Sequence, residues 1–100
     1  MNAVILSEAE EELEVAFDYY EQRNRGLGKE LVTEFRRSLE LILQFPKAWQ
    51  PLDRKYRRCR LHRFPYGIVY RIDTKNDHIV IVAVMHLSQK PGAWRPRDRD

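Results

Sequence analysis

The sequence has little of what would mark a secreted, membrane-embedded or multi-domain protein. It contains a single cysteine, Cys59, so no internal disulfide can form and nothing argues for an oxidising compartment. No stretch approaches the roughly 20 uninterrupted apolar residues of a membrane span. The N-terminus lacks the basic-then-apolar pattern of a signal peptide. We therefore expect one compact domain over residues 1–100, located in the cytoplasm and without membrane contact.

Candidate metal ligands are sparse and poorly spaced. The three histidines, His62, His78 and His86, and the cysteine lack the short paired spacings of zinc sites. We expect no metal and no other cofactor. Cys59 is expected to pack in the core as a small apolar residue, because a nucleophilic cysteine would need a nearby base that the sequence does not mark.

The charge of the chain is unevenly distributed. The net charge is +3, but residues 1–50 carry 6 Lys/Arg against 10 Asp/Glu, whereas residues 51–100 carry 12 against 5. The second half is therefore basic and is expected to meet an anionic partner, either nucleic acid or an acidic protein segment. A solvated basic face would give the same composition.

The first half of the chain predicts a strand followed by two helices. Asn2 to Leu6 form a short apolar run that predicts a strand. Ser7, with Glu10 three residues later, predicts a capping box that starts a helix from Glu8 to about Arg23. This helix has an apolar stripe at helical spacing, made of Ala9, Leu13, Ala16, Phe17 and Tyr20.

Two glycines, Gly26 and Gly28, predict a tight turn into the second helix, so that the two helices form an antiparallel hairpin. Pro46 and Pro51 end this helix and open a loop, Phe45 to Lys55, in which Trp49 is the expected anchor. Leu31, Phe35, Leu39, Ile42 and Leu43 form its apolar face, and Glu30, Glu34, Arg37, Glu40 and Gln44 are expected to face away.

The second half changes to a period of two, which predicts strands over Arg57 to Phe64 and Tyr66 to Asp73. Ile79 to Met85 is apolar throughout, as in a central strand covered on both faces. The expected fold class is α+β in the order β-α-α-β-β-β, with the helical hairpin packed on one face of an antiparallel sheet. The last stretch, Leu87 to Asp100, is expected to lie over the surface as a tail and to fray at its end.

This order of elements, together with several motifs, resembles the RelE/ParE toxin superfamily. The resemblance covers Val4 to Arg97. Its motifs are Phe64-Pro65-Tyr66-Gly67-Ile68-Val69-Tyr70-Arg71, the apolar run Ile79 to His86, the helix segments Ala9-Glu10-Glu11-Glu12-Leu13 and Asp18-Tyr19-Tyr20, and the closing Pro91-Gly92-Ala93-Trp94-Arg95. The family resemblance implies the toxin of a type II toxin-antitoxin system, of the plasmid-stabilisation kind.

The superfamily divides into toxins that cleave mRNA in the ribosome and ParE-type toxins that inhibit DNA gyrase. If the chain cleaved RNA, the resemblance would assign charge stabilisation to Arg58 and Arg60, with Lys90 as a possible substitute for a further basic residue. Between the histidines His62 and His86, which could transfer protons near neutral pH, His86 at a strand end is the better candidate. However, the arginine that contacts the scissile phosphate in cleaving members is replaced by Gly67, and after the last strand only Lys90 could substitute for their further arginine. These departures favour the ParE-like branch, and no catalytic residue is assigned with it.

Antitoxins of this class carry a disordered, acidic-amphipathic segment that folds over the toxin, so a cognate antitoxin is the expected partner, in a toxin-antitoxin hetero-oligomer. Arg57, Arg58 and Arg60 are the expected contacts, with a groove beside Leu27 and Leu31. The full set of candidate target-binding or antitoxin-binding residues is Arg57, Arg58, Arg60, His62, Arg63, Arg71, His86, Trp94 and Arg95.

The arginines, His86 and Trp94 also have a structural interpretation. Alternating arginines are typical of a solvated sheet face, His86 could merely hydrogen-bond the tail, and Trp94 could clamp the tail to the body. Three functions therefore stay open: a gyrase-inhibiting toxin, a ribosome-dependent mRNA endonuclease, and an inactive module that only binds the antitoxin.

Overall fold

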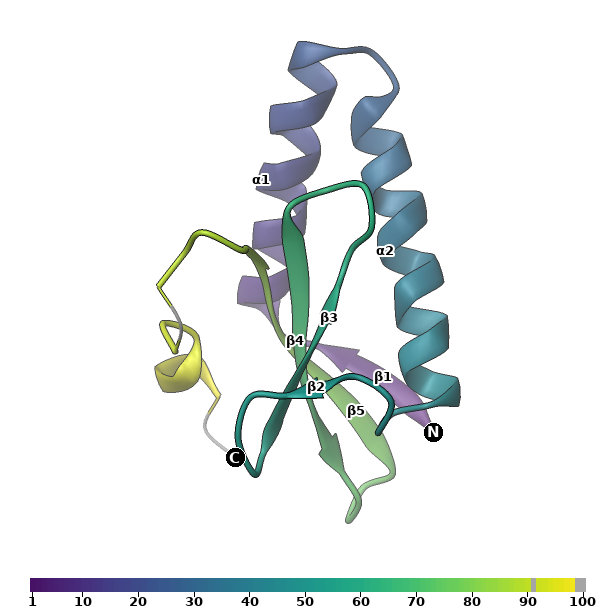
Figure 1. Cartoon of the computed structure of the whole chain (residues 1–100), viewed down its shortest axis with the longest axis vertical. Coiled ribbons are helices and arrows are strands. Elements are labelled where there is room, and N and C mark those ends of the chain that lie inside the picture. The colour runs from purple at the N-terminus through teal and green to yellow at the C-terminus, as the bar shows by residue number, and fades with distance from the viewer. Residues whose placement is uncertain (91, 99–100) are drawn as a thin grey trace.

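The computed structural model describes residues 1–90 and 92–98. A hairpin of two long helices packs against one face of a five-stranded sheet with the strand order β1-β5-β4-β3-β2 (Figure 1). The elements are β1 (Asn2–Ile5), α1 (Ser7–Arg23), α2 (Leu27–Gln44), β2 (Gln50–Pro51), β3 (Tyr56–Arg60), β4 (Tyr66–Asp73), β5 (His78–His86) and a final 3₁₀ turn, η1 (Arg95–Arg97). The expected α+β class and the one-sided helical hairpin are confirmed.

The sheet is mixed, which corrects the expectation of a wholly antiparallel sheet. β3, β4 and β5 are joined by short connections and therefore alternate in direction. β1 is separated from them by both helices and pairs in parallel with β5, with Asn2 opposite His78 and Ile5 opposite Ile81. The short strand β2, inside the expected loop, extends the sheet at its other edge by pairing with Arg57 and Arg58.

The start of α1 also differs from the expectation. The helix begins at Ser7, Leu6 occupies the N-cap position, and no side chain caps the helix. The Ser7 hydroxyl donates instead to the neighbouring Glu8 carboxylate at 3.3 Å, so the predicted capping box with Glu10 is wrong. The backbone of Leu6 supplies the first acceptor, because its carbonyl accepts from the N–H groups of Ala9 and Glu10.

The predicted turn between the helices depends on both glycines. Gly26 has a φ of 92°, which favours glycine. A Cβ on Gly28 would lie 2.6 Å from the Phe17 carbonyl oxygen, so the two helices can approach this closely only with glycine there. The Glu21 carboxylate accepts from the N–H groups of Gly26 and Gly28 at 2.9 and 3.0 Å and thereby holds the turn.

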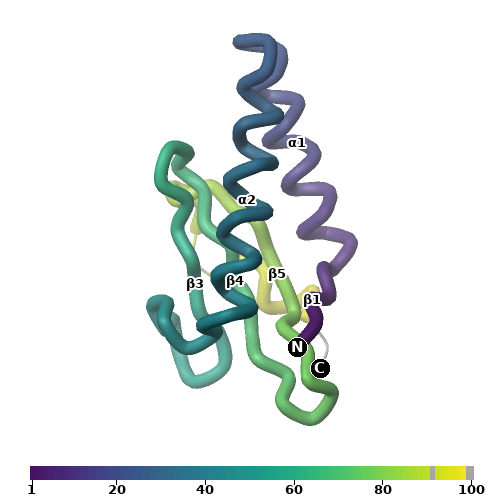
Figure 2. The backbone as a smooth tube through the Cα atoms, turned by 90° about the vertical axis from the view of Figure 1, so that its right-hand side faces the viewer, coloured from purple at the N-terminus to yellow at the C-terminus, as the bar shows by residue number. Residues whose placement is uncertain are grey.

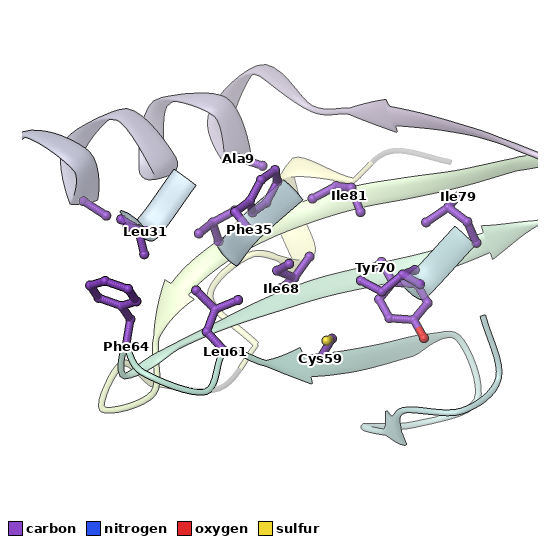
Figure 3. Packing of buried hydrophobic residues seen from close by; sticks show 13 residues of the cluster. Ala9, Leu31, Phe35, Cys59, Leu61, Phe64, Ile68, Tyr70, Ile79 and Ile81 are labelled. Atoms are coloured by element: carbon purple, nitrogen blue, oxygen red, sulfur yellow. The ribbon is translucent and has the colours of Figure 1, made fainter. Parts of the chain in front are cut away.

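The helix-side core contains the predicted apolar faces of both helices, except that Phe17 of α1 is only partly buried and lies outside this cluster. Figure 3 shows Leu31 and Phe35 of α2 on the face of the sheet that carries Ile68 and Ile81, and all four are at most 3% exposed. Cys59 packs in this core as expected, and burial raises the pKa of its thiol to about 11. Across the described part of the chain, no helix combines the length and the apolar character needed to span a bilayer.

The opposite face of the sheet is covered by the C-terminal tail. Trp94 is 2% exposed and packs with Tyr56, Val69, Val82 and Met85. Figure 2 shows this segment behind β5, with α2 in front of the sheet. The tail therefore lies on the body as predicted, whereas the predicted fraying falls on residues 99–100, which lie outside the described residues.

Candidate functional site

A pocket of about 230 Å³ lies on the tail-covered face of the sheet, between the strands and the tail. We call it the tail pocket. Four of the predicted site residues line it, namely Arg58 from β3, His86 from the end of β5, and Trp94 and Arg95 from the tail. Its remaining lining residues are Leu52, Val69, Met85, Leu87, Gln89 and Gly92. The structure therefore brings together residues that are far apart in the sequence.

Arg58 is paired with Val69 of β4, and its side chain extends over the neighbouring Gly67. A Cβ on Gly67 would be 2.9 Å from both Cγ and Cδ of Arg58, so the missing side chain makes room for the arginine stem. The Nε of Arg58 is buried, and no hydrogen-bond acceptor for it is found among residues 1–90 and 92–98. A buried donor of this kind favours the entry of a carboxylate or another acceptor.

His86 is held by the turn that follows β5. Its Nδ1 accepts the Ser88 backbone N–H at 3.1 Å and lies 2.7 Å from the Ser88 hydroxyl. Because Nδ1 needs its lone pair for this bond, the proton of the neutral imidazole is assigned to Nε2. The ring also packs edge-on against Tyr66, with 5.2 Å between centroids. His86 thus binds the start of the tail segment and contributes to the pocket at the same time.

Trp94, which lines the tail pocket, packs against the ring of Tyr56 beside it. The rings of Trp94 and Tyr56 meet edge to face at 4.4 Å between centroids. The Arg95 guanidinium lies 4.6 Å from the Trp94 ring centroid and forms an ion pair with Asp53 at 2.7 Å. Trp94 therefore clamps the tail to the body, as its structural interpretation proposed.

Arg71 lies inside the fold rather than on the basic surface. Its Nε and Nη2 donate to the two carboxylate oxygens of Asp98 at 2.8 and 3.1 Å. Their side chains are 8% and 2% exposed. The Tyr56 hydroxyl donates to the same carboxylate at 2.7 Å, and burial together with this contact raises the pKa of Tyr56 to about 12. Burial opposes ionisation of Asp98, but the bonds from Arg71 and Tyr56 outweigh it, so the pKa of Asp98 is lowered.

The remaining predicted basic residues lie along β3 and the loop after it, except for Lys90, which follows β5. Arg57 points to the helix side and donates to the carbonyl oxygens of Lys47 and Trp49 at 3.1 and 2.8 Å. Arg60 and His62 are exposed, and Arg63 is also exposed while it pairs with Glu30 at 2.6 Å. Lys90 is exposed as well. Neither Arg60 nor Lys90 lines the tail pocket, so the four residues proposed for RNA cleavage do not all share it.

Glu34 was expected to face solvent, and this prediction is wrong. Glu34 is only 9% exposed, and its carboxylate accepts the backbone N–H groups of His62 and of Arg63. It thereby fixes the β3–β4 loop to α2. Its place between Leu31 and Phe35, on the border of the apolar face, was the only sequence signal of this role.

Of the two residues predicted to border a groove, Leu31 offers no exposed surface and Leu27 is only partly buried. Leu31 is fully buried in the core and Leu27 packs against it. The part of the chain that the structure describes holds no group of three His, Cys, Asp or Glu side chains arranged to bind a metal.

Comparison with known proteins places the chain in a family. A family model described as "ParE toxin of type II toxin-antitoxin system, parDE" matches residues 4–91. The fold is similar to a solved structure of the chromosomal ParDE toxin-antitoxin system from P. aeruginosa, with a TM-score of 0.74 and 16% sequence identity, covering 86% of this chain and 95% of that one. No curated protein sequence matches significantly. Because the family model spans nearly the whole folded body, the chain belongs to the ParE toxin family of type II toxin-antitoxin systems.

Proposed function

We propose that the chain arrests growth by inhibiting DNA gyrase through protein–protein contact, and that a cognate antitoxin neutralises it in the cytoplasm. The observation that carries the gyrase target is the arrangement of Arg58 over Gly67. The RNA-cleaving branch needs an arginine at this position, and here the stem of Arg58 lies 2.9 Å from where any side chain at position 67 would begin. An added arginine would displace Arg58, so the absence of the phosphate-contacting arginine at position 67 supports the ParE-like branch over the RNA-cleaving one.

A ribosome-dependent mRNA endonuclease is the second candidate, because Arg58 and His86 line the same pocket. Arginine could stabilise the charge of a phosphorane, and a neutral histidine could transfer a proton. This function would require Arg60 and Lys90 to act from outside the pocket.

Expression of the chain without an antitoxin separates these functions. A gyrase inhibitor would induce the SOS response and cleaved DNA in cells, and the purified chain would reduce supercoiling by purified gyrase while a translation extract kept its mRNA intact. If mRNA were cut at the ribosomal A site and gyrase were unaffected, the gyrase assignment would be wrong. If growth continued normally with soluble, folded protein, the chain would be an inactive antitoxin-binding module.

The antitoxin is expected to contact the basic strand β3 and the loop after it. Arg60, His62 and Arg63 are exposed there, and β2 covers only the Arg57 and Arg58 positions of this sheet edge. An acidic segment of the antitoxin would find complementary charge along this edge. Binding of the protein encoded by a small neighbouring gene, measured with wild type and with Arg60→Glu, tests the contact. We expect at least tenfold weaker binding for Arg60→Glu, and equal binding would overturn this location.

A further inference from the structure

The outer edge of β5 is only half covered by a neighbouring strand. β1 pairs with His78 to Ile81, and the chain then turns into α1. From Ala83 to His86, β5 pairs with β4 on one side, and Val82 lies at the register shift of this pairing; on the other side, Val82 to His86 have no neighbouring strand within the described chain. An uncovered strand edge presents peptide groups that can pair with another extended chain.

Side chains occupy the peptide groups of this edge. Arg97 donates to the Val82 carbonyl at 3.3 Å, Glu12 accepts the Val84 N–H at 3.0 Å, and Gln89 accepts the His86 N–H at 2.7 Å. Glu12 and Arg97 also form an ion pair with each other at 2.8 Å, and their side chains are 25% and 20% exposed. These three polar side chains take the place of a strand. A partner's backbone could replace each of their bonds with an equivalent one.

A groove of about 520 Å³ runs beside this edge, between β5, α1 and the tail. We call it the β5-edge groove. Val15, which is 69% exposed, contributes apolar surface to its lining together with Tyr66 and Val84. Its charged lining consists of Glu8, Glu11 and Glu12 against the single arginine Arg97, with His86 and Gln89 beside them. This acidic lining repels phosphate groups, which excludes nucleic acid as the occupant and favours lysine or arginine side chains.

We propose that the β5-edge groove binds an extended segment of a partner protein, in which apolar residues alternate with lysine or arginine. The segment would add to the sheet beside Val82 to His86 and release the bonds of Arg97 and Gln89. One of its basic residues would take the place of Arg97 against Glu12. Backbone pairing would supply affinity, and the alternation of a strand would place every second side chain in the groove. This chemistry is opposite in charge to the acidic segment expected at β3, so the two surfaces would bind different segments.

The test uses the full chain labelled with ¹⁵N and a synthetic eight-residue peptide of alternating valine and lysine. A matched peptide of alternating valine and glutamate has the same length and the opposite charge. We expect the lysine peptide to bind at least tenfold more tightly, to shift the amide resonances of Val82 to His86, and to slow hydrogen exchange at Val84. Equal binding of both peptides, or shifts confined to β1 or β3, would overturn the proposal.

Variants sharpen the result. Arg97→Ala removes the competing side chain and is expected to tighten binding of the lysine peptide severalfold, whereas Glu12→Gln is expected to reduce its advantage over the glutamate peptide. Lys75→Ala, an equal loss of charge in the turn before β5, serves as control and should change neither value. If Arg97→Ala loosened the tail, the effect of Glu12→Gln on the preference for the lysine peptide would still test the proposal. Concentration-dependent protection of Val84 without peptide would assign the edge to a second copy of the chain and overturn a partner protein.

Discussion

The two faces of the sheet are covered in different ways. On the helix side, two long helices bury aliphatic residues such as Leu31 and Ile42, both at 0% exposure. On the tail side, a short irregular segment is held by one tryptophan, the buried Arg71–Asp98 ion pair and the Glu12–Arg97 and Arg95–Asp53 ion pairs. Burial of apolar area stabilises the first face over its whole length. The second face depends on a few individual contacts, so single substitutions there should act locally.

This difference suggests that the domain has a cooperative body and a separable cover. Regions with few apolar contacts open at lower free energy than the core of the same protein. The tail pocket lies at the boundary between the body and the tail, since Arg58 and Met85 belong to the strands while Trp94 and Arg95 belong to the tail. Four substitutions or reactions test the division, in order of decreasing effect.

Phe35→Ala should have the largest effect, because it opens a cavity in the cooperative body. Phe35 is 3% exposed, and removal of a buried phenylalanine costs about 3–5 kcal/mol of unfolding free energy. Urea unfolding monitored by circular dichroism measures the loss. The exposed neighbour Arg36→Ala should stay within about 0.5 kcal/mol of wild type. A loss below about 1 kcal/mol for Phe35→Ala would show that the helix face is not the dominant core.

Trp94→Ala should lower the unfolding free energy by about 3 kcal/mol, the lower end for a buried tryptophan, because Asp98 and Arg97 still hold the tail. The remaining tryptophan, Trp49, packs on the helix side and reports on that face by fluorescence. We expect hydrogen exchange to accelerate at Val82 and Met85 while the Trp49 signal before unfolding stays unchanged. A shifted Trp49 spectrum in the folded variant would contradict a separable cover.

Asp98→Asn should cost about 2 kcal/mol, because it weakens charge-assisted hydrogen bonds with Arg71. The folded pKa of Asp98 lies below the unfolded value, which is about 3.9. Its stabilisation is therefore fully present above that value and is lost as the pH falls through the lower folded pKa. Urea midpoints of wild type and Asp98→Asn should converge in strong acid, and a constant difference down to pH 2 would exclude this ion pair as the cause.

The fourth test measures the reactivity of the Cys59 thiol, and it comes last because it involves no change in unfolding free energy. With a pKa of about 11, this thiol at neutral pH should react with a disulfide reagent about a hundredfold more slowly than an unperturbed thiol. Phe35→Ala should raise the rate, because it loosens the face on which Cys59 lies, and Trp94→Ala should not. Equal acceleration by both variants would mean that the two faces open together.

The sequence predicted the helix side better than the tail side. The periods of α1 and α2 identified their apolar residues, because packing against a sheet demands a continuous stripe. Asp98 and Arg71 looked like two surface charges, since nothing local distinguishes a buried ion pair from a solvated one. The buried role of Glu34 could not be predicted for the same reason. The backbone N–H groups that donate to its carboxylate lie in a loop nearly thirty residues away.

The sequence predicted individual residues of the candidate site but not that they share one pocket. Only the fold brings together four of them, namely Arg58, His86, Trp94 and Arg95. Arg71 and Arg57 were also predicted to bind a partner, but they form hydrogen bonds within the protein, to Asp98 and to the Trp49 carbonyl. Alternation along a strand assigns a residue to a face, but it does not show what covers that face. The parallel pairing of β1 with β5 could not be predicted either, because the order of strands in a sheet depends on contacts between distant segments of the chain.

The pairing of β1 with β5 has a consequence for synthesis of the protein. β1 is synthesised before both helices, yet its partner β5 follows all the other strands in the chain. β1 must therefore remain unpaired until β5 has left the ribosome, and closing such a long loop slows folding. A nascent chain that stops before β5 lacks the strand that joins β1 to β4. The five-stranded sheet can thus form only after β5 has been translated, which gives a cell an interval in which the newly made chain is not yet assembled.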